Sequence, residues 1–289
     1  MDKIAVKALA KINLGLDVLK RREDGYHEVK MVMQTIHLYD QLMIEKTEEG
    51  IYLETNLSFL PTDASNLAYR AAQMLKEEYG IHEGIVIKLN KHIPVAAGMA
   101  GGSTDAAGVL YGLNELFELG LTRKQLMEKG VKLGADVPYC MMRGTALAEG
   151  IGEKLKALPP MVKCPVVIAK PQVSVSTRFV YENLSLNEDT KHPNIDQLIQ
   201  DISKKDLPAI ASHMGNILET VTIKKYPQIE LIKDTMRHNG ALNAMMSGSG
   251  PTVFGLFSDI ETAKKAAAAV RKSGLSRQVF VTDIYNNRR

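Results

Sequence analysis

Hydrophobic and polar residues alternate with a period of two at the start of the chain. The apolar residues on even positions are Ile4, Val6, Ala8, Ala10, Ile12, Leu14, Leu16 and Val18. Alternation over this length predicts one long β-strand with a single buried face. The odd positions place Lys11 and Asn13 side by side on the other face. That face is either solvated, as is usual for a lysine on a strand, or lines a site.

A second segment with strand character runs from Glu28 to Leu38, after a turn at Asp24-Gly25. Tyr26 and His27 lie at this turn, where an aromatic face and a ring nitrogen can meet a ligand. A tyrosine and a histidine beside a turn mostly serve packing, so the pattern alone leaves both interpretations open.

Capping residues mark the start of two predicted helices. The segment 63–66, Asp-Ala-Ser-Asn, precedes a helix that begins at about residue 67. Thr122 and Gln125 have the spacing of a capping box for another helix, which should end near Gly134.

Asp136 follows that second helix in the sequence GADVP. We expect it just beyond the helix C-terminus, because Pro138 prevents the helix from continuing. A carboxylate in that place is disfavoured by the helix dipole unless a cation or a ligand compensates it. Lys11 is the candidate cation.

The best position for a domain boundary is Pro159-Pro160, which divides the chain into domains 1–160 and 161–289. The second part predicts a strand at 166–169, helices between 195 and 237, and then a strand, a turn, a strand, a helix and a strand at 242–246, 247–252, 253–257, 260–271 and 278–284. This order on a mostly antiparallel sheet favours an α+β domain.

The segment 94–105, PVAAGMAGGSTD, is rich in glycine and lies between a predicted strand at 85–89 and a predicted helix. Such a backbone can bring its N–H groups close to a phosphate, and a helix N-terminus favours anions. The segment is either an ordinary loop or a binding loop for a nucleoside triphosphate. It lacks the GxxxxGK[ST] of a Walker A loop and the GxGxxG of a dinucleotide fold. A second glycine-rich turn, SGSGPT at 247–252, reads by itself as a tight hairpin.

Composition limits the classes of partner. The chain has 289 residues, 45% of them hydrophobic, and a formal net charge of +3. The lysines are dispersed, so we expect small-molecule ligands rather than nucleic acid. Two cysteines without metal spacing predict buried thiols in a reduced, cytoplasmic protein. The charged, alternating N-terminus is unlike a targeting peptide, and no apolar run is long enough to cross a membrane.

These motifs together resemble the GHMP kinases. The glycine run of that superfamily follows a proline and ends in Ser-Ser or Ser-Thr, here Ser103-Thr104, and a second turn like SGSGPT comes from its C-terminal domain. The segments AKINLGLDV and DGYH resemble the members that phosphorylate an alcohol linked to cytidine diphosphate. The resemblance implies an α+β, two-domain GHMP kinase fold, with an N-terminal ribosomal protein S5 domain 2-like domain and a C-terminal ferredoxin-like domain.

The resemblance also implies roles for individual residues. Asp136 accepts the proton of the substrate hydroxyl, and Lys11 holds the hydroxyl and the aspartate in register. The substrate site further contains Asn13, with Tyr26 stacked on the cytosine, His27 at its edge and Tyr181 over its other face. The ATP phosphates are cradled by the residues Pro94, Val95, Ala96, Ala97, Gly98, Met99, Ala100, Gly101, Gly102, Ser103 and Thr104, with Asn66 and Lys91 near the adenine.

The implied cofactors are ATP and Mg2+, and no residue is assigned to the metal. The chain is expected to act as a monomer or a weak homodimer. Two alternatives stay open at this point. Another small-molecule GHMP kinase, such as a homoserine kinase, shares the glycine-rich loops but needs no cytosine site. A nucleotide-binding sensor without catalysis needs neither Lys11 nor Asp136.

Overall fold

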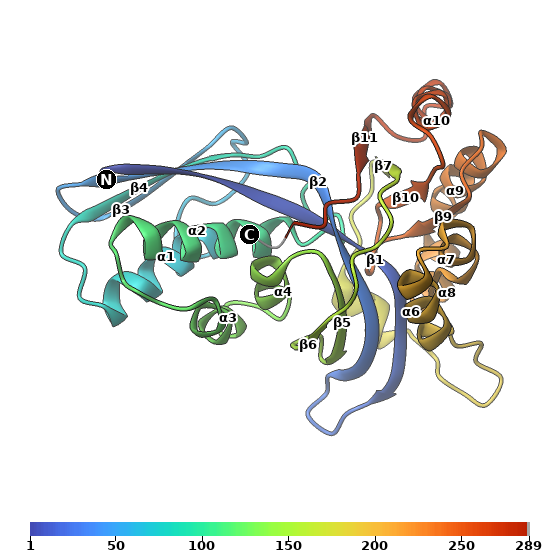
Figure 1. Ribbon diagram of the computed structural model, residues 1–289, viewed down its shortest axis with the longest axis horizontal. Helices are drawn as coiled ribbons and strands as arrows, with labels where there is room; N and C mark the ends of the chain where they lie inside the picture. Colours follow the sequence, from blue (N-terminus) through green and yellow to red (C-terminus); the bar gives the residue numbers. More distant parts are fainter. Residues whose placement is uncertain (288–289) are drawn as a thin grey trace. The chain divides into compact units, whose positions relative to one another are not determined.

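The computed structural model describes residues 1–287, and Figure 1 labels its elements along the chain. The strands are β1 (Lys3–Arg21), β2 (His27–Thr47), β3 (Ile51–Thr55), β4 (Gly84–Asn90), β5 (Thr145–Gly150), β6 (Lys154–Ala157), β7 (Pro165–Lys170), β8 (Gly215–Asn216), β9 (Asn243–Met246), β10 (Val253–Leu256) and β11 (Gln278–Asp283). The helices are α1 (Leu67–Glu78), α2 (Gly101–Leu116), α3 (Arg123–Val131), α4 (Val137–Met142), α5 (Thr177–Glu182), α6 (Ile195–Lys204), α7 (Leu207–His213), α8 (Glu219–Lys225), α9 (Gln228–His238) and α10 (Ile260–Lys272). The α+β prediction is confirmed.

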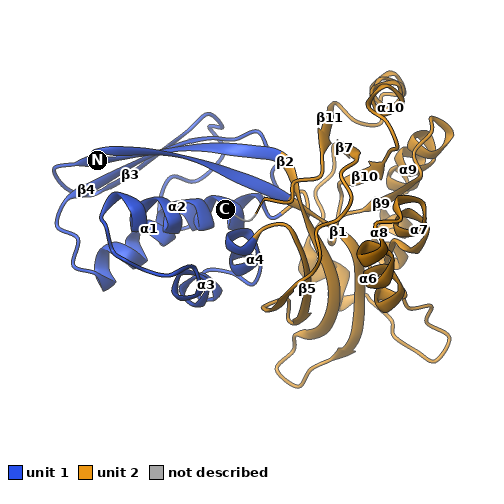
Figure 2. Cartoon of the chain, in the orientation of Figure 1, with its two compact units in different colours: residues 1–10, 38–95, 100–142 blue, residues 11–37, 96–99, 143–289 orange. Residues whose placement is uncertain are grey.

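The chain forms two compact units, each assembled from separate segments (Figure 2). Unit 1 contains residues 1–10, 38–95 and 100–142, and unit 2 contains residues 11–37, 96–99 and 143–289. The long strands β1 and β2 therefore each contribute one part to each unit. The division of the chain after residue 160 stays a prediction.

In unit 1, helices pack on a β-sheet. In this sheet β2 and β4 are antiparallel neighbours, and their register runs from Gln41 opposite Asn90 to Thr47 opposite Gly84. Helix α2 lies very close to this sheet, because two of its four glycines, Gly108 and Gly112, face the strands. A Cβ atom added at Gly108 would lie 2.5 Å from Leu42 Cδ1. The apolar residues of this helix, among them Val109, Leu110 and Leu113, are buried.

In unit 2, a second sheet has the order β11-β7-β10-β9, and its neighbouring strands are antiparallel. Helices α9 and α10 pack on this sheet. The turn 247–252 joins β9 to β10, which pair with Val253 opposite Met246. The predicted order of strand, turn, strand, helix and strand in this part of the chain is confirmed.

Strand β1 differs from its prediction in one respect. A single buried face is correct only up to Ala8, because every residue from Ala8 to Val18 is buried. Within unit 2, the second face is covered by α6. A Cβ atom added at Gly15 would lie 2.7 Å from Ile195 Cδ1, so this helix lies against the backbone of the strand. The face that carries Lys11 and Asn13 is consequently not solvated.

Asp136 also differs from its prediction. It lies between α3 and α4, and its carbonyl oxygen accepts a hydrogen bond from Cys140 N at 3.0 Å, as the residue before a helix does. Pro138 is in the first turn of α4, where a missing N–H costs nothing. Asp136 therefore precedes a helix instead of ending one, and the dipole of α4 favours its carboxylate.

Both cysteines are buried thiols, as expected, and burial raises the pKa of Cys164 to about 12. Within residues 1–287, no helix is long and apolar enough to cross a membrane.

Candidate active site

In unit 1, helix α2 begins within the glycine-rich segment 94–105. Ala100 precedes the helix with a left-handed backbone, φ 57°, and its side chain makes no capping hydrogen bond. The first N–H groups of an α-helix have no partner within the helix, and here they belong to residues whose small side chains leave room for a ligand. Gly101 and Gly102 open the helix. This end of α2 is thus suited to bind an anion.

The two hydroxyl residues of the first turn have different surroundings. Thr104 is buried, and its hydroxyl donates to Leu9 O at 2.8 Å, which ties α2 to β1 within unit 1. Ser103 is half-buried. Its Oγ lies 4.0 Å from the position of a Cβ atom added at Gly134, two residues before Asp136. Of the pair, Ser103 is the better placed to meet a ligand.

Lys91 lies in a buried cluster with two carboxylates of unit 1. Its ammonium pairs with Asp40 and, at 2.6 Å, with Asp105. Asp40 also accepts from the backbone N–H of Ile93 at 2.8 Å. Asp105 Oδ1 has no hydrogen-bond partner among the described residues. Burial, followed by the charge of Asp40, raises the pKa of Asp105 to about 8, although Lys91 opposes the shift.

Through this cluster Lys91 has a structural role beside the glycine-rich segment. A Cβ atom added at Gly101 would lie 3.3 Å from Lys91 Nζ, so the cluster supports the start of α2. The expected position of Lys91 near adenine stays a prediction. Asn66 has a structural part as well, because its Oδ1 accepts from Ala68 N at 2.9 Å and caps α1. Its Nδ2 donates to Pro61 O at 2.9 Å.

Lys11 and Asn13 form a buried pair on β1 in unit 2. Lys11 Nζ donates to Asn13 Oδ1 at 2.8 Å and to Gly98 O at 3.2 Å. The backbone N–H of Lys11 donates to Met99 O at 3.2 Å, which joins the strand to the glycine-rich segment. Lys11 is 5% exposed and Asn13 is fully buried. Of the two interpretations of this strand face, the structure thus excludes the solvated one.

Gly98 connects this pair to the second glycine-rich turn. Its φ is +70°, and a Cβ atom added there would lie 2.2 Å from Ser247 O, so only glycine fits. The Ser247 hydroxyl donates to Gly98 O at 3.0 Å, and Lys11 Nζ donates to the same oxygen. The interpretation of 247–252 as a simple hairpin turn is therefore incomplete, because the turn contacts the segment that holds Lys11.

The residues expected around a cytosine are brought together in part, all within unit 2. The rings of His27 and Tyr181 have centroids 5.0 Å apart and planes inclined by 40°. Tyr26 is 61% exposed, which is unusual for a large aromatic side chain. Burial, with a smaller contribution from the charge of Arg21, lowers the pKa of His27, so its ring is neutral at pH 7. A neutral imidazole both donates and accepts hydrogen bonds.

Sequence reasoning missed three residues of these clusters. Asp40 and Asp105 hold Lys91, and Asn216 donates to two carbonyl groups on either side of Ser247. A carboxylate inside an apolar helix pattern, as Asp105 is, was a signal that could have been used. Asn216 gave no such signal, because its partners lie about thirty residues further along the chain.

Two family models match the chain on either side of residue 160. The N-terminal domain of the GHMP kinases matches residues 66–144, and the GHMP kinase C-terminal domain matches residues 190–275. Among solved structures, a crystal structure of 4-(cytidine 5'-diphospho)-2C-methyl-D-erythritol kinase has a TM-score of 0.85 and 33% identity, covering 98% of this chain and 100% of its own. A homoserine kinase from Cytophaga hutchinsonii shares the fold, with a TM-score of 0.80 and 22% sequence identity. The match covers 100% of this chain and 96% of the homoserine kinase chain.

The curated relatives are more similar in sequence. A 4-diphosphocytidyl-2-C-methyl-D-erythritol kinase of Lachnospira eligens is 54% identical over 286 residues, which is 99% of each chain. A protein of the same name from Lachnoclostridium phytofermentans is 54% identical over 289 residues, 100% of this chain and 99% of its own. The matched regions include both units. The chain therefore belongs to the GHMP kinases and, within them, to the 4-diphosphocytidyl-2-C-methyl-D-erythritol kinase family.

Proposed function

We propose that the chain is an ATP-dependent kinase that phosphorylates the 2-hydroxyl of 4-diphosphocytidyl-2-C-methyl-D-erythritol. The products are the 2-phosphate and ADP, and the reaction belongs to the non-mevalonate (MEP) pathway to isoprenoid precursors. The names of the relatives support this substrate. The observation on the chain that carries the proposal is the buried Lys11–Asn13 pair, which places a fixed ammonium beside the glycine-rich segment.

The residues of the glycine-rich segment have distinct parts in this proposal. The N-terminus of α2 binds the phosphates through backbone N–H groups and the helix dipole. Ser103 adds a hydroxyl, whereas Thr104 anchors the helix through Leu9. Lys91 lies close to Gly101 and supports the start of α2. Contacts of Lys91 and Asn66 with the adenine are proposed from the resemblance alone.

Phosphoryl transfer makes modest demands on Asp136. An aspartate titrates near about 3.9 and an unactivated hydroxyl near about 15.7, a gap of roughly 16 kcal/mol. Full deprotonation before transfer would consume the whole barrier of a kinase that turns over about ten times a second. In a loose transition state the nucleophile needs little activation. We therefore assign to Asp136 the orientation of the hydroxyl and late acceptance of its proton, and to Lys11 the neutralisation of charge.

Magnesium fits this chain as an ion held mainly by the nucleotide. Among residues 1–287, no three His, Cys, Asp or Glu side chains gather into a metal cluster. Mg2+ usually takes one or two protein oxygens together with phosphate oxygens and water, and Ser103 and Asp136 can offer one oxygen each. Bound Mg2+ would neutralise charge that develops on the phosphates.

Tyr26, His27 and Tyr181 are proposed to hold the cytosine. The exposed ring of Tyr26 offers a stacking surface, and the neutral ring of His27 can donate to the base edge and accept from it. Further proposals are that the protein is cytoplasmic, that it acts as a monomer or weak homodimer, and that it does not bind nucleic acid.

The test is ADP release from ATP and Mg2+ with the cytidyl alcohol, compared with homoserine, mevalonate and galactose. We expect turnover with the cytidyl alcohol alone. Turnover with another alcohol would support kinase activity but contradict the proposed cytosine site. No turnover with any of the four alcohols would favour a nucleotide sensor. In Asp136→Asn, turnover should fall by at least about 100-fold. Asp196→Asn, at an exposed ion pair with Lys30, is the control.

The cytosine site has its own test. Tyr26→Ala should weaken binding of the cytidyl alcohol by about 1–3 kcal/mol, the range for a base stacked on an aromatic ring. Calorimetric titration of the alcohol measures this loss. Tyr52→Ala is the matched control, because Tyr52 is also an exposed tyrosine and lies on β3 in unit 1. Equal affinity of wild type and Tyr26→Ala would place the cytosine elsewhere.

A further inference from the structure

The second glycine-rich turn reaches the groups that hold Lys11. Ser247 is fully buried, and its hydroxyl shares the carbonyl oxygen of Gly98 with the Lys11 ammonium. A Cβ atom added at Gly248 would lie 3.2 Å from Gly98 O and 3.6 Å from Asn13 Oδ1. Because contacts are this close, a small displacement of the turn must displace the Gly98 carbonyl as well.

Asn216 holds the backbone on both sides of Ser247. Its Nδ2 donates to Met246 O at 2.9 Å and to Gly248 O at 2.8 Å, so both amide hydrogens are used. Its Oδ1 accepts from Leu218 N at 3.0 Å. Asn216 is 7% exposed, and carbonyl groups that lose their donors in such a place are costly to leave unpaired.

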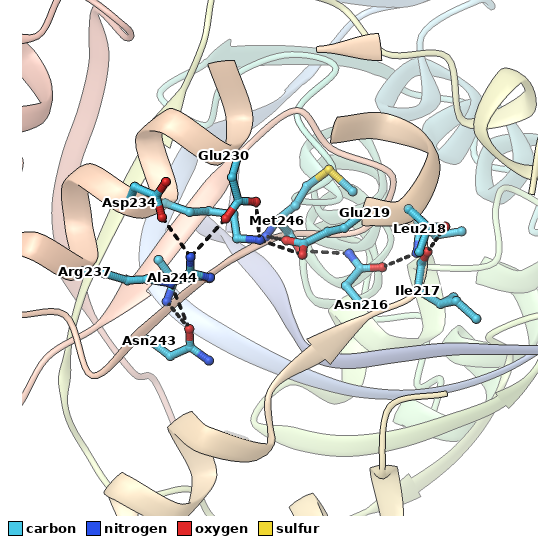
Figure 3. A network of polar contacts seen from close by, with 12 residues as sticks. Asn216, Ile217, Leu218, Glu219, Glu230, Asp234, Arg237, Asn243, Ala244 and Met246 are labelled. Carbon is cyan, nitrogen blue, oxygen red and sulfur yellow. Dashed lines mark hydrogen bonds and ion pairs between the residues drawn. The ribbon is translucent and has the colours of Figure 1, made fainter. Parts of the chain in front are cut away.

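The position of Asn216 is itself well defined. It belongs to β8, which pairs in parallel with β1 at Gly15 and Leu16, a few residues after Lys11 and Asn13. Glu219 adds a second restraint, because its Oε1 accepts from Met246 N at 2.7 Å. Figure 3 shows Asn216 and Glu219 both directed at the Met246 backbone. The residue before Ser247 is therefore held through its N–H and through its carbonyl.

We propose that Asn216 is a positioning residue for phosphoryl transfer: it fixes the backbone around Ser247 so that Ser247 and Lys11 share the Gly98 carbonyl. The inference rests on the proposed function, which gives Lys11 its part in the reaction. Asn216 has no contact with Lys11 in this scheme and acts through the turn. A misplacement of about 1 Å in a catalytic group can cost about 100-fold in rate.

The first test compares Asn216→Asp with wild type. The new carboxylate is nearly the same size but turns acceptor oxygens toward two carbonyls, so the turn should shift. We expect kcat to fall about 10- to 100-fold, with KM for ATP and for the alcohol changed less than about threefold. Asn243→Asp is the matched control, because Asn243 on β9 also donates to a carbonyl, Ala211 O at 2.7 Å, but not in the turn. An unchanged kcat in Asn216→Asp overturns the proposal.

A double-mutant cycle asks whether Asn216 acts through Ser247. Ser247→Ala removes the hydroxyl that meets Gly98 O, and kcat should fall in this variant too. If the two residues act in series, Asn216→Asp has a smaller effect in the Ser247→Ala protein than in wild type. Additive effects would mean that Asn216 only stabilises the fold, and the proposal would fail.

Hydrogen exchange separates this inference from the proposed function, because it needs no substrate. Backbone amides in 96–101 and 246–250 should exchange several-fold faster in Asn216→Asp and at the wild-type rate in Asn243→Asp. Unchanged exchange in 96–101 overturns the positioning role even if the kinase assay succeeds. If exchange is faster in Asn216→Asp but the wild-type protein does not phosphorylate the cytidyl alcohol, the role of Asn216 in holding the loop is supported and the proposed function is rejected.

Discussion

Each unit contains a lysine between two carboxylates, and the two clusters are built differently. In unit 1, Lys91 pairs with Asp40 and Asp105, and the three side chains are almost completely buried. In unit 2, Lys233 pairs with Glu219 at 2.8 Å and with Glu230 at 2.9 Å, and the Glu230 side chain is 37% exposed. Each cluster lies next to a glycine-rich segment. Lys91 lies close to Gly101, and Glu219 accepts a hydrogen bond from Met246 N, directly before the turn 247–252.

The difference lies in what each cluster does with its excess negative charge. Asp105 Oδ1 has no hydrogen-bond partner among the described residues, and the pKa of this carboxyl rises to about 8. Glu219 uses both oxygens, one for Met246 N and one for Lys233. Arg237 adds a second cation to Glu230 at 3.0 Å. The first cluster therefore keeps a proton at pH 7, whereas the second spreads its charge over more partners.

The largest effect is expected at Lys91. In Lys91→Met, Asp40 stays buried without its cation, so the free energy of unfolding should fall by about 3–5 kcal/mol. Urea titration followed by circular dichroism measures the loss. Lys88→Met is the control. Lys88 on β4 forms an ion pair with Glu45 on β2 at the surface, so its loss should change stability by less than about 1 kcal/mol. A loss at Lys91 no larger than this would contradict the electrostatic account of the cluster.

Lys233→Met should have a smaller effect, about 2 kcal/mol, because Glu219 keeps its bond to Met246 N and Glu230 keeps Arg237. The same urea titration applies, with Lys264→Met, at an exposed pair with Glu261, as control. If Lys233→Met proved more damaging than Lys91→Met, the idea that extra partners share the charge of this cluster would have to be abandoned.

The smallest effect concerns pH. Asp105 keeps its proton in the folded protein up to about pH 8, whereas in the unfolded chain it loses it near about 3.9. Between these values the folded state binds more protons, so stability falls as pH rises, by at most about 1.4 kcal/mol between pH 6 and pH 7. Asp105→Asn replaces the neutral acid with a neutral amide. Its stability should decline less over this interval, and parallel curves for the two proteins would mean that Asp105 is already ionised.

Local patterns were sufficient to predict most elements. Alternation located β1, and capping residues located α1 and α3, because each of these features depends on neighbours within a few residues. The glycine-rich segment 94–105 was correctly placed after β4, but its last five residues belong to α2 and not to a loop before it. The buried second face of β1 depends on α6, nearly two hundred residues away, and no local pattern carries that information.

Asp136 and Asn216 illustrate two kinds of failure at the site. For Asp136, Pro138 was taken as the end of a helix, although a proline is equally compatible with the first turn of the next one. For Asn216, the hydrogen-bond partners are backbone carbonyls, which any residue type presents, so the residue types around it gave no indication. Side chains that bind backbone from distant segments are the hardest to find in a single sequence.

The sharing of β1 and β2 between the units has a consequence for protein engineering. Each unit is made of three separate stretches of chain, so no single cut in the gene releases either unit whole. A fragment that begins at residue 161 would lack residues 11–37, and with them the strand partner of β8. Exchange of one unit between related kinases would therefore require several coordinated crossovers, and recombination at one breakpoint would leave at least one unit with segments from both parents.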